Sequence, residues 1–368
     1  MKSIRLGPLK LESDLLLAPM MDVTTPSYIL LCKHYGGLGL YTIPMIFVNQ
    51  VAAAPKTVRP HLEFIEKNRP SGLQICGSGK EIEPIEKAVQ FIDSYDFDFL
   101  DINCGCPARH TCNSGGGASL MKDGRIQDVI RLIETTMKNT SKPVSIKIRL
   151  GWSSTEHLEE FVRLVNEYDF AWLTVHGRLA TQKYRGIVDI DSIRRAVELS
   201  QHPVVANGDV YDYYSFDKLK AITGADAVMI GRATMGYPSI FRDIVHRESY
   251  RDQVDISELL DQFSDYPAAE FQPNFRQHVE HRNELEDLEK YMLLLLNFLK
   301  GLPKYWNNDK FKAIEIKRNM IWAVKYMKHG AWLRRQIGQL RGLQPVVDYI
   351  TGDKIKRDYE NGNPNLQK

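Results

Sequence analysis

The first 235 residues alternate between short apolar runs and longer amphipathic stretches. Eight of the runs are rich in apolar and β-branched residues and end in turn residues or polar groups, a pattern typical of strands buried on both faces of a parallel sheet. They span Leu15–Met20, Leu38–Met45, Gly72–Gly77, Phe99–Gly105, Val144–Gly151, Trp172–Arg178, Pro203–Asp209 and Ala227–Ala233. The amphipathic segments between them, such as Lys80–Ser94, Asp123–Lys138 and Thr155–Asn166, predict helices.

Eight strands that alternate with helices predict an α/β fold of the (β/α)8 TIM barrel type. A doubly wound open sheet also alternates strands and helices, and it is the main alternative. The count of eight favours the barrel, as does the lack of a Gly-x-Gly-x-x-Gly motif after the first run.

The character of the chain changes after about residue 245, where the strand-like runs stop. Helices are predicted over Glu258–Phe263, Asp287–Leu302 and Lys310–Arg341. Residues 251–300 hold 5 Lys+Arg and 11 Asp+Glu, a net charge of −6, whereas residues 301–345 hold 10 and 2, a net charge of +8. We therefore expect a barrel domain over 1–245, a smaller all-helical domain over 246–350 and a polar tail over 351–368.

Composition excludes several classes of protein. With 48 Lys+Arg against 46 Asp+Glu, the net charge of +2 gives no general preference for a polyanion. Five cysteines in 368 residues do not make a disulfide scaffold. No apolar stretch is typical of a signal peptide or of a membrane span. We expect a soluble, cytoplasmic protein with no membrane association, no metal and no obligate protein partner.

Polar residues interrupt the apolar pattern at the ends of six predicted strands. Because catalytic groups of TIM barrels lie at the carboxyl ends of the strands, these residues are the candidate site. They are Met20-Met21-Asp22, Gln74, the segment Asn103 to Pro107, Lys147, His176, and Asn207-Gly208-Asp209. Placing lysine and histidine in apolar strand ends is costly without a functional reason.

The last two strand ends predict a phosphate site. Asn207-Gly208-Asp209 and Gly231-Arg232 follow strands seven and eight, where barrels commonly bind phosphate, although glycines there could serve only to turn the chain. Lys147 could stabilise an anionic reduced flavin ring and Gln74 could bond its polar edge, unless Lys147 is a surface lysine. A ring with a phosphate in a barrel mouth suggests flavin mononucleotide (FMN).

A cysteine-rich loop follows the fourth strand. Its sequence is Asn103-Cys104-Gly105-Cys106-Pro107, and Cys112 lies nearby. The Cys spacing is not a common zinc pattern, His110 is the only candidate for a fourth ligand, and a Cys104–Cys106 disulfide would be strained. A thiol here suits proton transfer or nucleophilic catalysis, and composition does not choose between the two.

Taken together, these motifs give the sequence a resemblance to the tRNA-dihydrouridine synthases, flavin enzymes that reduce uridine in RNA. Eight motifs occur in the family's order over roughly residues 10–245. They are Ala18-Pro19-Met20-Met21-Asp22-Val23-Thr24, Leu73-Gln74-Ile75-Cys76-Gly77, Asp101-Ile102-Asn103-Cys104-Gly105-Cys106-Pro107, Gly115-Gly116-Gly117-Ala118-Ser119-Leu120, Ile146-Lys147-Ile148-Arg149-Leu150-Gly151, Val175-His176-Gly177-Arg178, Ala206-Asn207-Gly208-Asp209-Val210 and Met229-Ile230-Gly231-Arg232-Ala233.

The resemblance implies a role for each matching position. Cys106 falls on the catalytic acid. NADPH would reduce FMN, hydride would pass to C6 of a uracil ring, and the Cys106 thiol would protonate C5. The positions that fall on the family's FMN contacts are Pro19, Met20, Met21, Gln74, Lys147, His176, Asn207, Gly208, Asp209, Gly231 and Arg232.

The basic C-terminal segment fits the family's helical RNA-binding domain, with tRNA or another structured RNA as partner. Aromatic residues interleave with its cations, although a solvated helix with an apolar core face would look the same. The candidate RNA contacts are Arg149, Arg178, Lys317, Arg318, Arg334 and Arg335.

Three other functions stay open at this point: the same chemistry on ribosomal RNA, a flavin barrel acting on a free pyrimidine, and an RNA-binding barrel without catalysis. The +8 segment disfavours the second, since a small substrate needs no such surface. Cys106 and Lys147 disfavour the third. The chain departs from the family's pattern at Thr42-Ile43-Pro44-Met45, at Leu179-Ala180 and at Ile190, positions that bear on how RNA is held.

Overall fold

A computed structural model describes residues 3–248 and 284–363 of the chain. The backbone divides into two compact units. Among the described residues, the barrel unit comprises 3–24, 37–231 and 241–248, and the helical unit comprises 25–36, 232–240 and 284–363. The predicted helix Glu258–Phe263 and most of the acidic stretch 251–300 lie outside the described residues.

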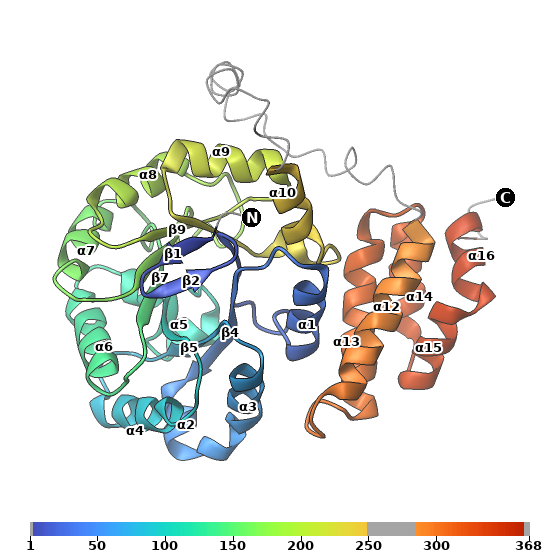
Figure 1. The fold of residues 1–368 in the computed structure, drawn as a ribbon, viewed down its shortest axis with the longest axis horizontal. Coiled ribbons are helices and arrows are strands. Elements are labelled where there is room, and N and C mark those ends of the chain that lie inside the picture. The colour runs from blue at the N-terminus through green and yellow to red at the C-terminus, as the bar shows by residue number, and fades with distance from the viewer. Residues whose placement is uncertain (1–2, 249–283, 364–368) are drawn as a thin grey trace. The chain divides into compact units, whose positions relative to one another are not determined.

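Eight parallel strands form a closed barrel, as the sequence predicts (Figure 1). Each strand pairs with the next along the chain, and the last pairs with the first, so the barrel has no free edge. The strands are β3 (Leu15–Leu17), β4 (Leu40–Phe47), β5 (Ser71–Cys76), β6 (Phe99–Cys104), β7 (Val144–Arg149), β8 (Trp172–His176), β9 (Val204–Asn207) and β10 (Ala227–Ile230). Almost every strand residue is buried, which explains their continuous apolar runs.

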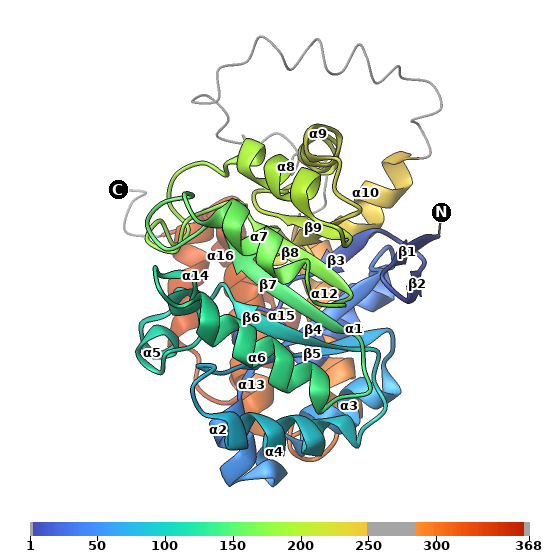
Figure 2. The same cartoon turned by 90° about the vertical axis from the view of Figure 1, so that its left-hand side faces the viewer.

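Helices between the strands cover the outside of the barrel (Figure 2). Their apolar faces carry the periodicity seen in the sequence, and local caps begin some of them: the Asp212 carboxylate accepts the Ser215 N–H at the start of α9. These elements are α2 (Val48–Ala53), η1 (Pro55–Thr57), α3 (Arg59–Lys67), α4 (Ile82–Asp93), α5 (Arg109–Asn113), η2 (Gly117–Met121), α6 (Ile126–Lys138), α7 (Leu158–Val165), α8 (Ile190–Leu199), α9 (Tyr213–Thr223) and α10 (Ile240–Glu248).

An antiparallel hairpin of β1 (Ile4–Leu6) and β2 (Leu9–Leu11) packs against the barrel's amino-terminal core. Leu6 and Leu11 belong to one buried apolar cluster with Phe99 and Trp172, whose rings lie 4.7 Å apart. Gly72 makes room for the Phe99 ring, since a Cβ at this position would lie 2.1 Å from it. We call this end of the barrel the hairpin end and the opposite end, at the carboxyl ends of the strands, the mouth.

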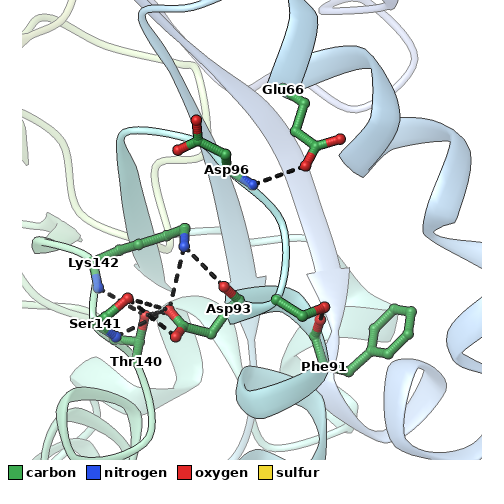
Figure 3. A network of polar contacts seen from close by, with 8 residues as sticks. Glu66, Phe91, Asp93, Asp96, Thr140, Ser141 and Lys142 are labelled. Carbon is green, nitrogen blue, oxygen red and sulfur yellow. Dashed lines mark hydrogen bonds and ion pairs between the residues drawn. The ribbon is translucent and has the colours of Figure 1, made fainter.

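A polar network outside the hairpin end holds the connection from α6 to β7 (Figure 3). The Asp93 carboxylate, at the end of α4, accepts hydrogen bonds from the hydroxyls of Thr140 and Ser141. The Lys142 ammonium donates to the Asp93 carbonyl at 2.9 Å and lies 4.7 Å from the centre of the Phe97 ring. These contacts fix the chain two residues before β7 begins.

The helical unit includes a segment that lies between two barrel strands in the sequence. Its elements are α1 (Pro26–Tyr35), η3 (Arg232–Thr234), α12 (Glu284–Gly301), α13 (Asp309–Ala323), η5 (Val324–Tyr326), α14 (Gly330–Gln339), α15 (Leu343–Thr351) and α16 (Asp353–Asn361). Thr25 and Ser27, at the start of α1, both donate to the buried Glu315 carboxylate on α13. The Tyr28 ring lies edge-on to Trp322 at 6.2 Å.

This organisation differs from the domain boundaries that the sequence predicts. Thr25–Gly36 groups with the C-terminal helices, where its hydroxyls satisfy the buried Glu315 carboxylate and Tyr28 contacts Trp322. The single helix predicted over Lys310–Arg341 is broken between α13 and α14, where His329 adopts a positive φ of 54°. The predicted polar tail contains α16, which buries Ile355 and uses Asp358 to accept from Trp332 and Tyr349.

Within the described ranges, no helix has both the length and the apolar character needed to cross a membrane.

Candidate active site

The mouth of the barrel gathers the polar residues that the sequence places at the strand ends. Lys147 on β7 is in register with Asn103 on β6, and His176 on β8 is in register with Asn207 on β9. The Lys147 ammonium donates to the Asn207 Oδ1 at 2.8 Å, and the Asn207 amide donates to the Met229 carbonyl on β10. Alternation along each strand points these side chains inward, so the structure brings together residues 60 positions apart.

Burial changes the acid–base behaviour of Lys147. Its pKa is lowered to about 8, mainly by desolvation; the Asp101 carboxylate opposes this shift and the Arg149 cation adds to it. The Lys147 ammonium therefore lies inside the mouth, bonded to Asn207, and is not the surface lysine that the sequence left possible.

Cys106 follows β6 on a loop that its neighbours hold tightly. The Asn103 Oδ1 accepts the N–H groups of Gly105 at 3.0 Å and Cys106 at 2.9 Å. The Cys106 carbonyl accepts the Ala118 N–H at 2.9 Å, and its thiol lies 3.6 Å from the Thr111 hydroxyl. Gly117 has φ 57°, and a Cβ there would lie 2.7 Å from the Cys106 carbonyl oxygen, which explains the glycine run in the sequence.

Three of the other four cysteines are buried, unlike Cys106, which is partly exposed. Cys32, Cys76 and Cys104 are buried, and desolvation raises the pKa of Cys76 to about 12. Cys112 is partly exposed and donates its thiol to the Cys106 carbonyl at 3.5 Å. Burial and the neighbouring Cys106 raise the pKa of Cys112. In the part of the chain that the structure describes, no three His, Cys, Asp or Glu residues form a group that could hold a metal ion.

Asp101 is a buried carboxylate in the mouth that the sequence reasoning did not single out. It is 3% exposed and accepts from the Ser145 hydroxyl and from the Gln74 amide, each at 2.6 Å. Burial raises its pKa to about 6, opposed by those two hydrogen bonds and by Lys147. A charged residue within an apolar strand, two positions before Asn103 and therefore on the same face, was the available signal.

The loop after β9, one part of the predicted phosphate site, has two residues with positive φ. Gly208 has φ 140° and Asp209 has φ 49°. The Asp209 carboxylate is engaged by the Arg178 guanidinium and by the Tyr211 hydroxyl at 2.9 Å. The backbone of Asp209, rather than its side chain, is thus the part suited to face a phosphate. Arg232 begins η3 and has an exposed side chain.

The segment that follows β3, the first barrel strand, lies next to the end of β10. Met20 is partly buried against the apolar cluster, while Met21 is half exposed. A Cβ on Gly231 would lie 3.4 Å from the Met20 sulfur. The Thr24 hydroxyl donates to the Ala18 carbonyl at 2.7 Å and accepts the Met20 N–H, which holds the segment that includes Pro19.

The burial of Arg149 and Arg178 does not agree with the predicted contacts to RNA. Arg149 is 3% exposed and donates to the carbonyls of Gly105, Leu179 and Lys183. Arg178 is 2% exposed and donates to Asp209 and to the Gly186 carbonyl. A buried guanidinium needs several acceptors, and here the mouth loops supply them. Both arginines hold loops together.

The four basic candidates of the helical unit lie on α13 and α14. Lys317 donates to the Leu340 carbonyl at 2.8 Å, and Arg318 lies 3.4 Å from Glu315. Arg334 donates to the Lys325 carbonyl at 3.1 Å, and Arg335 is exposed. The structure thus gives Lys317 and Arg318 structural partners, and their contacts with RNA stay a prediction.

Comparisons with known proteins show which family the chain resembles. A family model described as Dihydrouridine synthase matches residues 16–341. Two similar proteins are the tRNA-dihydrouridine synthase B of Escherichia coli K12, 32% identical over 84% of this chain and 92% of that one, and that of Xanthomonas axonopodis pv. citri, 32% identical over 66% of this chain and 72% of that one.

Two solved structures share the fold at low identity. Histamine dehydrogenase from Rhizobium sp. 4-9 matches 67% of this chain and 47% of its own, with a TM-score of 0.53 and 13% identity. The old yellow enzyme homologue from Zymomonas mobilis matches 72% of this chain and 98% of its own, with a TM-score of 0.50 and 14% identity. At these identities the likeness concerns the barrel.

Proposed function

The chain belongs to the dihydrouridine synthase family, and on that premise we propose that it reduces specific uridines of tRNA to 5,6-dihydrouridine. NADPH is the proposed reductant, FMN the proposed cofactor and Cys106 the proposed proton donor. The relatives named tRNA-dihydrouridine synthase B favour tRNA over ribosomal RNA as substrate.

The chemistry of the mouth residues fits a flavin. Gln74 and Asn103 offer amide groups, His176 a ring nitrogen and Lys147 a cation to one opening in the barrel. Lys147 would balance negative charge on a reduced ring, and the backbone of Gly208, Asp209 and Gly231 would face the phosphate. When bound, FMN would supply hydride transfer, which no protein side chain provides.

Cys106 is suited to donating a proton. Hydride addition at C6 of uracil leaves negative charge on C5 and O4, and a thiol within reach of C5 quenches that charge. A cysteine thiol is largely protonated at neutral pH, so it can act as a general acid without special activation. The two N–H bonds from the loop to Asn103 Oδ1 fix the position of Cys106, and this geometry carries the proposal.

The substrate base must leave its stack to reach such a site, which costs a few kcal/mol. Contacts elsewhere on the RNA would offset that cost. The net charge of +8 over residues 301–345 provides a surface suited to phosphates, where Arg335 is exposed and Arg334 is partly exposed.

Replacing Cys106 by alanine tests the proposal. We expect Cys106→Ala to keep its flavin and its oxidation of NADPH and to lose uridine reduction by about 100-fold or more, the usual contribution of a general acid. Dihydrouridine would be counted by mass spectrometry in tRNA and in ribosomal RNA treated with the enzyme.

Cys112→Ser is the matched control, because Cys112 is a partly exposed thiol close to the same loop. It should reduce uridine at a rate within a few-fold of the unmodified protein. Full activity of Cys106→Ala would refute the assigned acid, product in ribosomal RNA alone would refute the assigned substrate, and a protein that neither contains nor takes up FMN would refute the cofactor.

A further inference from the structure

Three polar side chains inside the barrel form a continuous line that ends at the cysteine loop. The Gln74 Nε2 donates to Asp101 Oδ2 at 2.6 Å, and the Asn103 Nδ2 donates to Gln74 Oε1 at 2.7 Å. The Asn103 Oδ1 then accepts the N–H groups of Gly105 and Cys106. Asp101, Gln74 and Asn103 are each 6% exposed or less, so water does not replace these bonds.

The direction of every bond in this line follows from its two ends. An ionised carboxylate only accepts, so Gln74 must turn its NH2 group toward Asp101 and its oxygen toward Asn103. Asn103 must then turn its NH2 group toward Gln74, which leaves its oxygen for the loop. Were Asn103 reversed, its NH2 group would face the N–H groups of Gly105 and Cys106, and these buried donors would lack an acceptor. Were Gln74 reversed, its oxygen would face the Asp101 carboxylate and its NH2 group would face the Asn103 NH2 group.

We propose that Asp101 is a positioning residue that holds the Cys106 loop in place through Gln74 and Asn103. Its acceptor-only carboxylate fixes the orientation of both amides and so keeps Asn103 Oδ1 available to the loop. The link to proton donation rests on the function proposed above for Cys106, whereas the hydrogen-bond relay itself does not.

A simpler role for Asp101 would be to balance the charge of Lys147. The two roles differ in what they predict for the loop. In the relay, Asp101 acts on Cys106 only through Asn103, so removing Asn103 makes Asp101 irrelevant to the loop. In charge balance, Asp101 and Asn103 affect the loop independently and their effects add.

Hydrogen exchange at the Gly105 and Cys106 amides measures the loop directly, by mass spectrometry with residue-level fragmentation of the purified full-length protein. Asp101→Asn keeps the shape of the side chain but can donate as well as accept, and we expect exchange at the two amides to rise at least fivefold. Asn103→Ala removes the acceptor and should raise exchange further. Adding Asp101→Asn to Asn103→Ala should then change exchange less than twofold.

The double variant Asp101→Asn with Asn103→Asp reverses the relay. The new amide at position 101 would donate to Gln74 Oε1, Gln74 would donate to the new carboxylate at position 103, and that carboxylate would accept both loop N–H groups. Exchange should return to within twofold of the unmodified protein. The rate at which iodoacetamide alkylates Cys106, which a loosened loop would change, should also return to the value of the unmodified protein. Cys112 alkylation, measured in the same digest, corrects for general loosening.

Ser145→Ala is the control for lost packing and hydrogen bonding at Asp101, because it removes one hydrogen bond to the carboxylate and leaves the three relay side chains in place. It should leave loop exchange unchanged. The proposal is overturned by unchanged exchange in Asp101→Asn, by additive effects of Asp101→Asn and Asn103→Ala, or by a reversed pair no better protected than Asp101→Asn. Should the single variants fail to fold, the reversed pair still decides.

The relay and the proposed function can fail separately. If the relay and the proposed function are both correct, Asp101→Asn lowers kcat for uridine reduction at saturating tRNA. It leaves KM for tRNA nearly unchanged, because the substitution does not touch the RNA contacts. Full uridine reduction by Cys106→Ala would remove the catalytic meaning of the relay while the exchange results stood.

Discussion

The two ends of the barrel use their interior in opposite ways. At the hairpin end the inward positions hold Phe99, Trp172 and leucines, and the hairpin adds Leu6 and Leu11. At the mouth the inward positions of the same strands hold Asp101, Lys147 and His176. β6 and β8 thus begin with an inward aromatic residue and carry inward polar residues a few positions later. Burying polar groups lowers stability unless each finds a partner, so the mouth is maintained for its chemistry and the hairpin end for the fold.

Trp172→Ala breaks the hairpin end and should give the largest loss of stability. Trp172 is 1% exposed and packs against Phe99. Truncating a buried aromatic side chain leaves a cavity and costs about 3–5 kcal/mol. Urea unfolding followed by tryptophan fluorescence and circular dichroism measures the loss. Trp172→Phe should recover a large part of it, and a loss below about 1 kcal/mol would contradict the packing assigned to this end.

Lys147→Met tests the mouth with a residue that keeps the length of the side chain. We expect uridine reduction to fall about 100-fold, equivalent to about 2.7 kcal/mol, because the cation beside the proposed flavin is lost. Stability should change little, since Lys147 is held in a desolvated site that lowers its pKa. Single-turnover kinetics and urea unfolding give the two quantities. An active Lys147→Met, or an unfolded one, would contradict this division of roles.

The eight strands and the candidate site could be predicted from the sequence for one physical reason. Strands buried on both faces are apolar throughout, so residues such as Lys147 and His176 stand out as costly exceptions. Their register is also predictable, because the carboxyl ends of all parallel strands meet at one end. The structure confirms the barrel that this reasoning predicts.

What the sequence could not supply is the pairing of polar groups. Arg149 and Arg178 look like RNA contacts in the sequence, yet both are buried. Arg149 donates to carbonyls 30 to 44 positions away, and Arg178 donates to the Gly186 carbonyl and to the Asp209 carboxylate. The relay from Asp101 to Cys106 needs two amide orientations that no spacing reveals. The grouping of α1 with the C-terminal helices depends on Glu315, 290 positions from Thr25.

A pH series compares the buried Asp101 with a version that does not titrate. Its pKa is raised from 3.8 to about 6 in the folded protein, so the folded state binds more protons than the unfolded state between these values. The stability that Asp101 contributes therefore falls as pH rises from about 4 to about 6 and is level above that range. Lys147, the charged group that acts on it, titrates near 8, outside this window.

We expect the unmodified protein to lose about 2 kcal/mol relative to Asp101→Asn between pH 4 and pH 7, since one pKa unit is worth about 1.4 kcal/mol. Urea unfolding of both proteins at each pH gives the difference, which cancels the other titrating groups. A difference that rises with pH would show that Asp101 is stabilised as a carboxylate, against the burial seen here.

Lys142→Met completes the comparison, because it makes the same substitution five residues before Lys147, in the connection that enters β7 at the hairpin end. Lys142 donates to the Asp93 carbonyl and lies 3.5 Å from the Asp93 carboxylate (Figure 3). Methionine keeps an apolar side chain beside the Phe97 ring. Losing one hydrogen bond to a charged donor should lower the free energy of unfolding by about 1 kcal/mol. Uridine reduction should stay within twofold, because these contacts hold the chain before β7 and do not reach the mouth.

Lys87→Met is the control at an exposed ion pair with Glu83, and it should change stability by less than Lys142→Met does. If Lys142→Met lowered activity as much as Lys147→Met, the two ends would be coupled through β7, and the separation of fold and chemistry along each strand would not hold.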